Sequence, residues 1–154
     1  MPASVLLIED NADTARLISG ALRSAGESFE VATVFSARDG LQHLAANAVD
    51  CVLLDYRLPD ADGLGCLREM RQAHPDVPVV VITGAGSEEV AVEAMKLGAS
   101  DYLVKHGKYL VTVPLVVREA LGRMGESSVF EEELATLRRE NAELRAQLDA
   151  QRRR

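Results

Sequence analysis

The chain has 154 residues, of which 47% are hydrophobic and 27% charged, and its formal net charge is −7. This length suits one domain with an appendage and supplies a real hydrophobic core. The negative charge argues against binding to nucleic-acid backbones, and the apolar runs are too short to span a bilayer. No basic segment precedes the first apolar run, so we expect no signal peptide and a cytoplasmic location.

Five short runs rich in Val, Ile and Leu predict β-strands. They cover residues 4–8, 29–34, 51–54, 77–83 and 101–104. Segments with helical spacing lie between them, and two of these segments end at Gly26 and Gly98, where left-handed helix caps are expected. Cys51 and Cys66 are expected to be buried and reduced. Alternating strands and helices predict an α/β fold, a doubly wound five-stranded parallel sheet of flavodoxin-like order 2-1-3-4-5.

The segment after the last strand, residues 109–124, is predicted to be a further helix. Its N-cap is expected at Thr112, with Pro114 in the first turn. Gly122 and Gly125 then weaken the helical pattern. We therefore place the domain boundary near Gly125, with a first domain over residues 1–125 and a C-terminal helix over 126–154.

The C-terminal segment carries a heptad repeat that predicts a coiled coil. Its seam residues follow one another at steps of four and three: Phe130, Leu134, Leu137, Asn141, Leu144 and Leu148. A single Asn at an a position with Leu at d favours a parallel two-stranded coiled coil, so we expect a parallel homodimer. The alternative is a solvated single helix packed on its own domain, since three heptads are few. The residues before the repeat are acidic rather than basic, which excludes a zipper-type DNA binder.

Polar residues stand at the ends of four predicted strands. Glu9 and Asp10 follow the first, Asp55 the third, Thr83 ends the fourth, and Lys105 follows the fifth. Any one of them alone is better explained as a turn or cap residue, but together they meet at the switch-point edge of the predicted sheet. Clustered carboxylates need a cation, and an oxygen-only site suits Mg²⁺. Asp55 is then placed to attack a phosphoryl group whose oxygens contact Lys105 and Thr83.

Four segments, VLLIEDN, VLLDYRLPDADGLG, VVVITGAG and AMKLGASDYLVK, resemble the signature segments of the receiver domain of bacterial two-component response regulators. The resemblance covers residues 4 to about 122. It implies that Asp55 is the phosphoacceptor and that Glu9 and Asp10 are the acidic pair that binds Mg²⁺. The backbone carbonyl of Arg57 would be a further metal ligand.

The same resemblance assigns the phosphoryl-contacting hydroxyl to Thr83 and the phosphoryl-contacting lysine to Lys105. It makes Tyr102 the switch aromatic, drawn inward when Thr83 moves toward the phosphoryl group. The sequence departs from the family at His106, where a proline after a cis bond is usual. A cis bond before a non-proline residue costs about 2.5–4 kcal/mol, so we expect a trans bond at Lys105–His106 or a reshaped loop.

The function implied is a signalling switch and not an enzyme, because the protein would assist only its own phosphorylation and dephosphorylation. A histidine kinase or phosphotransfer protein would donate to Asp55, and transfer would change the last helix of the domain and the coiled-coil dimer. An output domain beyond Arg154 stays open. The alternative is a receiver-like dimerisation scaffold independent of phosphorylation, which the missing proline keeps open. Aspartyl-phosphate hydrolases and FMN-binding flavodoxin-like proteins need motifs after the first strand that this sequence lacks.

Overall fold

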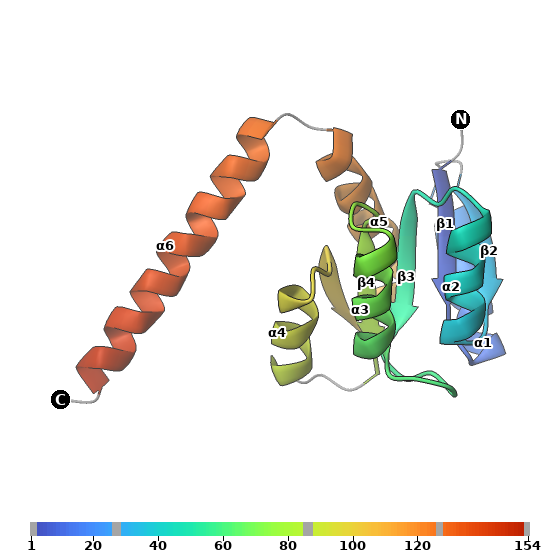
Figure 1. The fold of residues 1–154 in the computed structure, drawn as a ribbon, viewed down its shortest axis with the longest axis horizontal. Helices are drawn as coiled ribbons and strands as arrows, with labels where there is room; N and C mark the ends of the chain where they lie inside the picture. Colours follow the sequence, from blue (N-terminus) through green and yellow to red (C-terminus); the bar gives the residue numbers. More distant parts are fainter. Residues whose placement is uncertain (1–2, 26–28, 85–87, 126–127, 153–154) are drawn as a thin grey trace. The chain divides into compact units, whose positions relative to one another are not determined.

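The computed structural model describes residues 3–25, 29–84, 88–125 and 128–152, and the side chains of residues 123–136 and 152 lie outside this description. The chain divides into two compact units, Met1–Leu121 and Gly122–Arg154 (Figure 1). Within the described ranges, eleven elements follow one another: β1 (Ala3–Ile8), α1 (Ala12–Arg23), β2 (Phe29–Val34), α2 (Ala37–Ala46), β3 (Cys51–Asp55), α3 (Gly63–Ala73), β4 (Val79–Thr83), α4 (Glu88–Lys96), β5 (Asp101–Val104), α5 (Tyr109–Gly125) and α6 (Ser128–Arg152).

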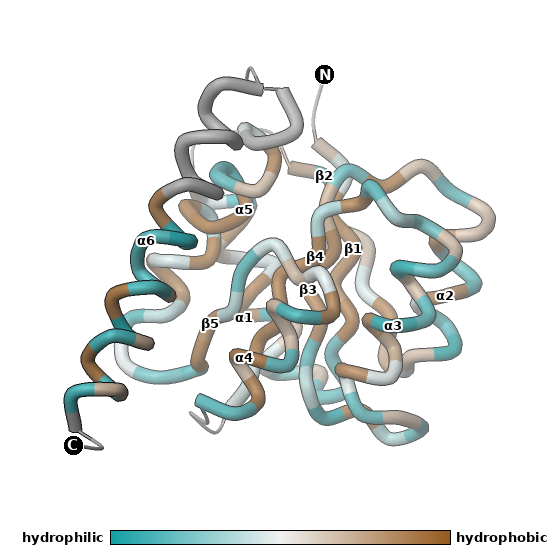
Figure 2. Tube along the Cα trace, turned by 60° about the vertical axis from the view of Figure 1, so that its left-hand side comes forward, coloured by the Kyte–Doolittle hydropathy of each residue, from teal (hydrophilic) through white to brown (hydrophobic). Residues whose placement is uncertain are grey.

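The five strands form one parallel sheet in the order β2-β1-β3-β4-β5. This arrangement confirms the predicted fold class and its strand order. The inner strands β3 and β4 are buried along their whole length, as strands covered on both faces should be. Figure 2 shows these central strands in the brown of hydrophobic residues.

Two hydrophobic clusters cover the two faces of the sheet. Successive residues of β1 alternate between them, because side chains of a strand point to opposite faces: Leu6 joins one cluster and Leu7 the other. The Leu7 cluster contains buried residues of α1 and α5, whereas the Leu6 cluster contains residues of α2, α3 and α4. Cys51 and Cys66 are buried with free thiols, one in each cluster, as predicted.

The sequence signals for the helix ends have different outcomes. Gly98 adopts a φ of +97° after α4, which confirms the left-handed cap expected there, whereas Gly26 lies outside the described residues. The expected start of α5 is wrong: the helix begins at Tyr109, and Thr112 lies inside it with its hydroxyl directed at the carbonyl of Lys108. Pro114 is consequently in the second turn and not the first.

The second unit contains α6, a helix of 25 residues. The seam residues Leu137, Leu144 and Leu148 are each more than half exposed in the single chain. Phe130 and Leu134 have side chains outside the description, so the coiled-coil dimer stays a prediction. Within the described ranges, no helix combines the length and the apolar character needed to cross a membrane.

Candidate functional site

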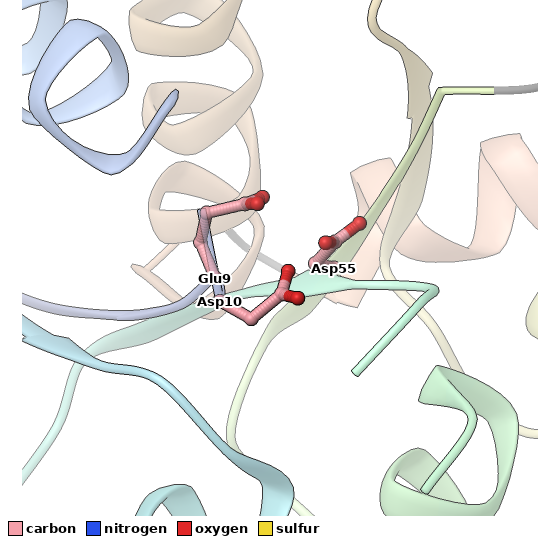
Figure 3. A group of neighbouring side chains, drawn as sticks. All are labelled: Glu9, Asp10 and Asp55. Carbon is pink, nitrogen blue, oxygen red and sulfur yellow. The ribbon is translucent and has the colours of Figure 1, made fainter. Parts of the chain in front are cut away.

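Three carboxylates meet at the carboxyl edge of the sheet. β1 and β3 pair in register up to Ile8 and Leu54, so Glu9 and Asp55 come next on neighbouring strands. Figure 3 shows Glu9, Asp10 and Asp55 gathered at this edge, and one oxygen of each lies within 4.8 Å of the others. Glu9 and Asp55 are 2% and 5% exposed, whereas Asp10 is exposed. The predicted acidic group therefore forms, with one open side.

Lys105 joins two of these carboxylates from the end of β5. Its backbone N–H donates to the carbonyl of Thr83 at 2.7 Å, which extends the pairing of β4 and β5 by one residue. Its ammonium lies 2.7 Å from Oε2 of Glu9 and 3.4 Å from Oδ1 of Asp55. The side chain of Lys105 is only 17% exposed, so this ion pair is largely shielded from water.

Burial and charge act together on these groups. Burial raises the pKa of Glu9, and the charge of Asp55 adds to this rise, while hydrogen bonds from Lys105 and from the Asn11 N–H oppose it. Burial by itself would lower the pKa of Lys105, but its hydrogen bond to Glu9 and the charge of Asp55 outweigh burial and raise it. Burial thus disfavours the charged form of Glu9, whereas the two carboxylates favour the charged form of Lys105.

A cavity of about 510 Å³ opens onto this cluster. It is lined by Glu9, Asp10, Asn11, Thr14, Asp55, Arg57, Gly84 and Lys105. Asn11 and Thr14 were missed in the sequence, although Asn11 is the N-cap of α1 and its side chain accepts from the Thr14 N–H at 3.0 Å. The signal for Asn11 was its position directly before a helix, where Asn is a favoured cap. The backbone N–H of Asn11 also donates to Oε1 of Glu9 at 3.3 Å.

The loop after Asp55 is held closed at its base. The N–H of Tyr56 donates to the carbonyl of Ile82 at 2.8 Å, and the N–H of Gly63 donates to the carbonyl of Tyr56 at 2.6 Å. Arg57 and Asp62 form an antiparallel bridge across the loop. A Cβ at Gly63 would lie 2.7 Å from Cα of Tyr56, so this close approach requires glycine.

The remaining predicted residues lie around this centre. Thr83 is buried at the end of β4, directly before the lining residue Gly84. Tyr102 on β5 is half-buried against the cluster on the α2–α3–α4 face. Among the described residues, neither Thr83 nor Tyr102 lines the cavity. Over the same residues no peptide bond is cis, so the Lys105–His106 bond is trans as expected. His106 is exposed, and the following residue, Gly107, has a φ of +59°.

The arrangement fits a divalent cation bound through oxygen. Mg²⁺ takes only a few protein carboxylates and keeps several waters, and the open side at the exposed Asp10 leaves room for these waters beside the carboxylates. A cation here would neutralise the crowded negative charge that Lys105 now balances only in part. Asp55 would keep a carboxylate oxygen directed at the cavity and available for attack on a phosphorus atom.

Comparisons with known proteins point the same way. A family model described as the response regulator receiver domain matches residues 5–110. The luminescence regulatory protein LuxO of Vibrio campbellii is 37% identical over 74% of this chain and 25% of its own length. The response regulator protein FleR of Pseudomonas aeruginosa is 39% identical over 80% of this chain and 26% of its own. The chain thus spans about a quarter of these curated relatives.

Solved structures share both fold and sequence with the chain. The receiver domain of NtrX from Brucella abortus is 36% identical with a TM-score of 0.70, over 77% of this chain and 98% of that domain. A response regulator receiver domain protein from Clostridium thermocellum is 30% identical with a TM-score of 0.71, over 80% of this chain and 97% of that protein. The residues that match the family model, 5–110, lie within the first unit and include Glu9, Asp10 and Asp55.

Proposed function

The chain belongs to the response regulator receiver domain family, and from this premise we propose that it is a phosphorylation-controlled switch whose phosphoacceptor is Asp55. The observation that carries the proposal is the cluster of Glu9, Asp10 and Asp55, whose oxygens lie within 4.8 Å of one another beside the ammonium of Lys105. A buried carboxylate next to a cation site and a fixed ammonium has what phosphoryl transfer requires, namely a nucleophile and compensation of charge.

The transfer joins Asp55 to a phosphoryl group from a histidine kinase or a phosphotransfer protein. A carboxylate oxygen of Asp55 attacks the phosphorus atom of a phosphohistidine, and a P–O bond forms as the P–N bond breaks. The departing imidazole nitrogen takes a proton from solvent, and the product is an aspartyl phosphate. Mg²⁺, bound through Glu9, Asp10, Asp55 and the carbonyl of Arg57, would supply charge compensation for the phosphoryl oxygens.

Two neighbouring residues would stabilise the transferred group. The ammonium of Lys105 already lies 3.4 Å from Asp55, so a small movement away from Glu9 brings it to a phosphoryl oxygen as a point charge. The hydroxyl of Thr83, at the end of the adjacent strand, donates to a second oxygen. Movement of Thr83 would leave space for Tyr102 to turn inward, which changes the surface of α4, β5 and α5.

The output would pass from α5 to α6. We expect two copies of α6 to form a parallel coiled coil, because the seam residues Leu137, Leu144 and Leu148 are exposed and unpartnered in the single chain. Sedimentation of the full chain tests this: Leu144→Glu should abolish the dimer, while Ala142→Glu, at an exposed position outside the seam, should leave it intact. Equal behaviour of the two variants would contradict a seam at Leu144.

Intact mass measurement with Mg²⁺ and a small acyl-phosphate donor tests the transfer itself. The wild type should gain one phosphoryl group, and the gain should vanish in Asp55→Asn and on addition of a chelator. The alternative function is a dimerisation scaffold that works without phosphorylation. Absence of any gain, with the acyl phosphate and with phosphorylated kinase alike, would refute the switch and leave the scaffold.

A further inference from the structure

Asp60, in the loop between β3 and α3, is an exposed acid with two backbone partners on a distant element. Its Oδ1 accepts from the N–H of Ala37 at 2.9 Å, and its Oδ2 accepts from the N–H of Arg38 at 3.0 Å. These two hydrogen bonds lower the pKa of Asp60. The carboxylate therefore ties the loop that follows Asp55 to the N-terminus of α2.

Asp60 accepts from two of the free donors at the N-terminus of α2. The first four N–H groups of a helix have no partner within the helix. Asp60 satisfies the N–H groups of Ala37 and Arg38, and the Ser36 hydroxyl satisfies that of Asp39, while the Gly40 N–H donates the first regular helical hydrogen bond to the Ser36 carbonyl. Asp60 and Ser36 thus cap the same helix end, but only Asp60 connects that end to the loop.

The helix at the other end of this connection is firmly held on the sheet. Ala37 and Leu44 are 4% and 6% exposed and belong to the hydrophobic cluster. Gly40 lies so close to Ile8 that an added Cβ would collide with the Ile8 side chain. Ile8 is the last residue of β1 and directly precedes Glu9. The N-terminus of α2 is thus a fixed point beside the strand that carries Glu9.

The loop itself has a closed base and a short tip. The bridge between Arg57 and Asp62 closes the base, and Leu58 and Ala61 pack against the cluster on the same face. Packing of apolar side chains is non-directional, so it does not by itself fix the orientation of a peptide group. The two hydrogen bonds of Asp60 hold the tip in one place relative to α2, and through the tip they restrain the backbone of Arg57.

We propose that Asp60 is a positioning residue for the metal and phosphoryl site, because it holds the 56–62 loop on the N-terminus of α2 and thereby fixes the Arg57 carbonyl. This inference rests on the proposed function, in which that carbonyl is a metal ligand. Coupling between two sites is reciprocal. Binding of Mg²⁺ at the acidic cluster therefore strengthens the contact between the loop and the first turn of α2.

The first test is the affinity for Mg²⁺, measured by calorimetry on the full chain. Residues that orient metal ligands cost about 10–100-fold in affinity when removed, so Asp60→Ala should bind Mg²⁺ about tenfold more weakly. Asp60→Asn keeps one oxygen acceptor and should show a smaller loss than Asp60→Ala. Ser36→Ala removes a cap from the same helix end without releasing the loop, and should keep the wild-type affinity even where its melting temperature falls.

Three outcomes would overturn the inference and leave the proposed function in place. Asp60→Asn and Asp60→Ala could lose the same Mg²⁺ affinity and regain it at about 1 M salt, where the Debye length is about 3 Å. That result would mean that only the charge of Asp60 matters. Equal losses in Ser36→Ala and Asp60→Ala would mean that Asp60 is only a helix cap. Wild-type affinity in both Asp60 variants would mean that the loop needs no tether. Absence of Mg²⁺ binding in the wild type would instead refute the proposed function and, with it, this role.

Hydrogen exchange of the wild type gives a second test that needs no variant. Saturation with Mg²⁺ should slow exchange at the amides of Ala37 and Arg38, which Asp60 holds, more than at the amide of Asp39, which Ser36 holds. Unchanged exchange at Ala37 and Arg38, or equal slowing at all three amides, would contradict the coupling.

Discussion

Replacement of Lys105 by methionine should destabilise the metal-free protein by an amount that depends on pH. Methionine keeps most of the apolar length of the side chain and removes the ammonium that lies 2.7 Å from Glu9. Glu9 is 2% exposed, so it must then either stay charged without its partner or take up a proton. Removal of one partner of a buried ion pair costs about 3–5 kcal/mol.

Protonation of Glu9 sets a limit on this cost. A pH of about 7 lies about 2.7 units above the ordinary glutamate pKa of about 4.3. Each unit corresponds to about 1.36 kcal/mol, so protonation of Glu9 limits the destabilisation to about 3.7 kcal/mol. At about pH 5 the same reasoning gives about 1 kcal/mol. The folded variant holds a proton that its unfolded state has lost, so its stability relative to wild type recovers as the pH falls.

Urea unfolding followed by tyrosine fluorescence measures this difference. The chain has three tyrosines and no tryptophan, and Tyr56, Tyr102 and Tyr109 all lie in the Met1–Leu121 unit, so the signal reports that unit alone. Lys108→Met, at an exposed position in the same loop, should change stability by less than about 0.5 kcal/mol. A loss of the same size at both pH values, or a loss below about 0.5 kcal/mol at about pH 7, would refute the reasoning.

Further predictions concern the surrounding structure. Gly63→Ala should lower both stability and phosphoryl uptake, because its Cβ would lie 2.7 Å from a backbone atom. Gly20→Ala in α1 has open space around the added Cβ, so it should raise stability by about 0.5–1 kcal/mol in the same urea titration. The Arg71 guanidinium donates to carbonyls after α3 and to the Gly98 carbonyl. Arg71→Met should therefore lower the free energy of unfolding by about 1.5–3 kcal/mol in that titration. A loss no larger than that from replacing an exposed arginine would contradict this expectation. Burial raises the pKa of Cys51 and of Cys66 to about 12 each, so neither thiol should react with a disulfide reagent at about pH 8 until urea unfolds the domain. These raised values also predict that stability falls as the pH rises above about 9, because the folded state keeps protons that the unfolded state loses.

The sheet and the carboxylate cluster could be predicted because their signals are local and repeated. Each strand is a short apolar run, and the alternation of strands with helices leaves few ways to order them. Once that order is known, residues that end neighbouring strands must lie together, whatever their separation in sequence. Glu9 and Asp55 met the expectation because β1 and β3 pair in register up to the residue before each of them.

The start of α5 could not be predicted from the same kind of signal. Thr112 and Pro114 imitate a cap and a first-turn proline, yet the helix begins at Tyr109. Val113, Val117 and Ala120 are buried in the cluster that α5 shares with α1. Packing of this apolar face determines the helix, and it tolerates a proline in the second turn.

Asp60 and Asn11 show a different limit. The partners of Asp60 are 22 and 23 residues away in sequence, and no periodicity links a loop carboxylate to the N–H groups of another helix. Asn11 is a recognisable cap, but its contact with Glu9 depends on the turn between β1 and α1. Contacts that arise from two elements meeting in space require the structure.

The most direct test of the central proposal is to locate the phosphoryl group on the chain. Borohydride reduction after incubation with Mg²⁺ and an acyl-phosphate donor converts an aspartyl phosphate to homoserine, which peptide sequencing by mass spectrometry then finds. We predict homoserine at position 55 and unchanged carboxylates at Glu9 and Asp10. Homoserine at position 10, or an unmodified Asp55 in a protein that has gained a phosphoryl group, would contradict the assignment of Asp55 as the phosphoacceptor.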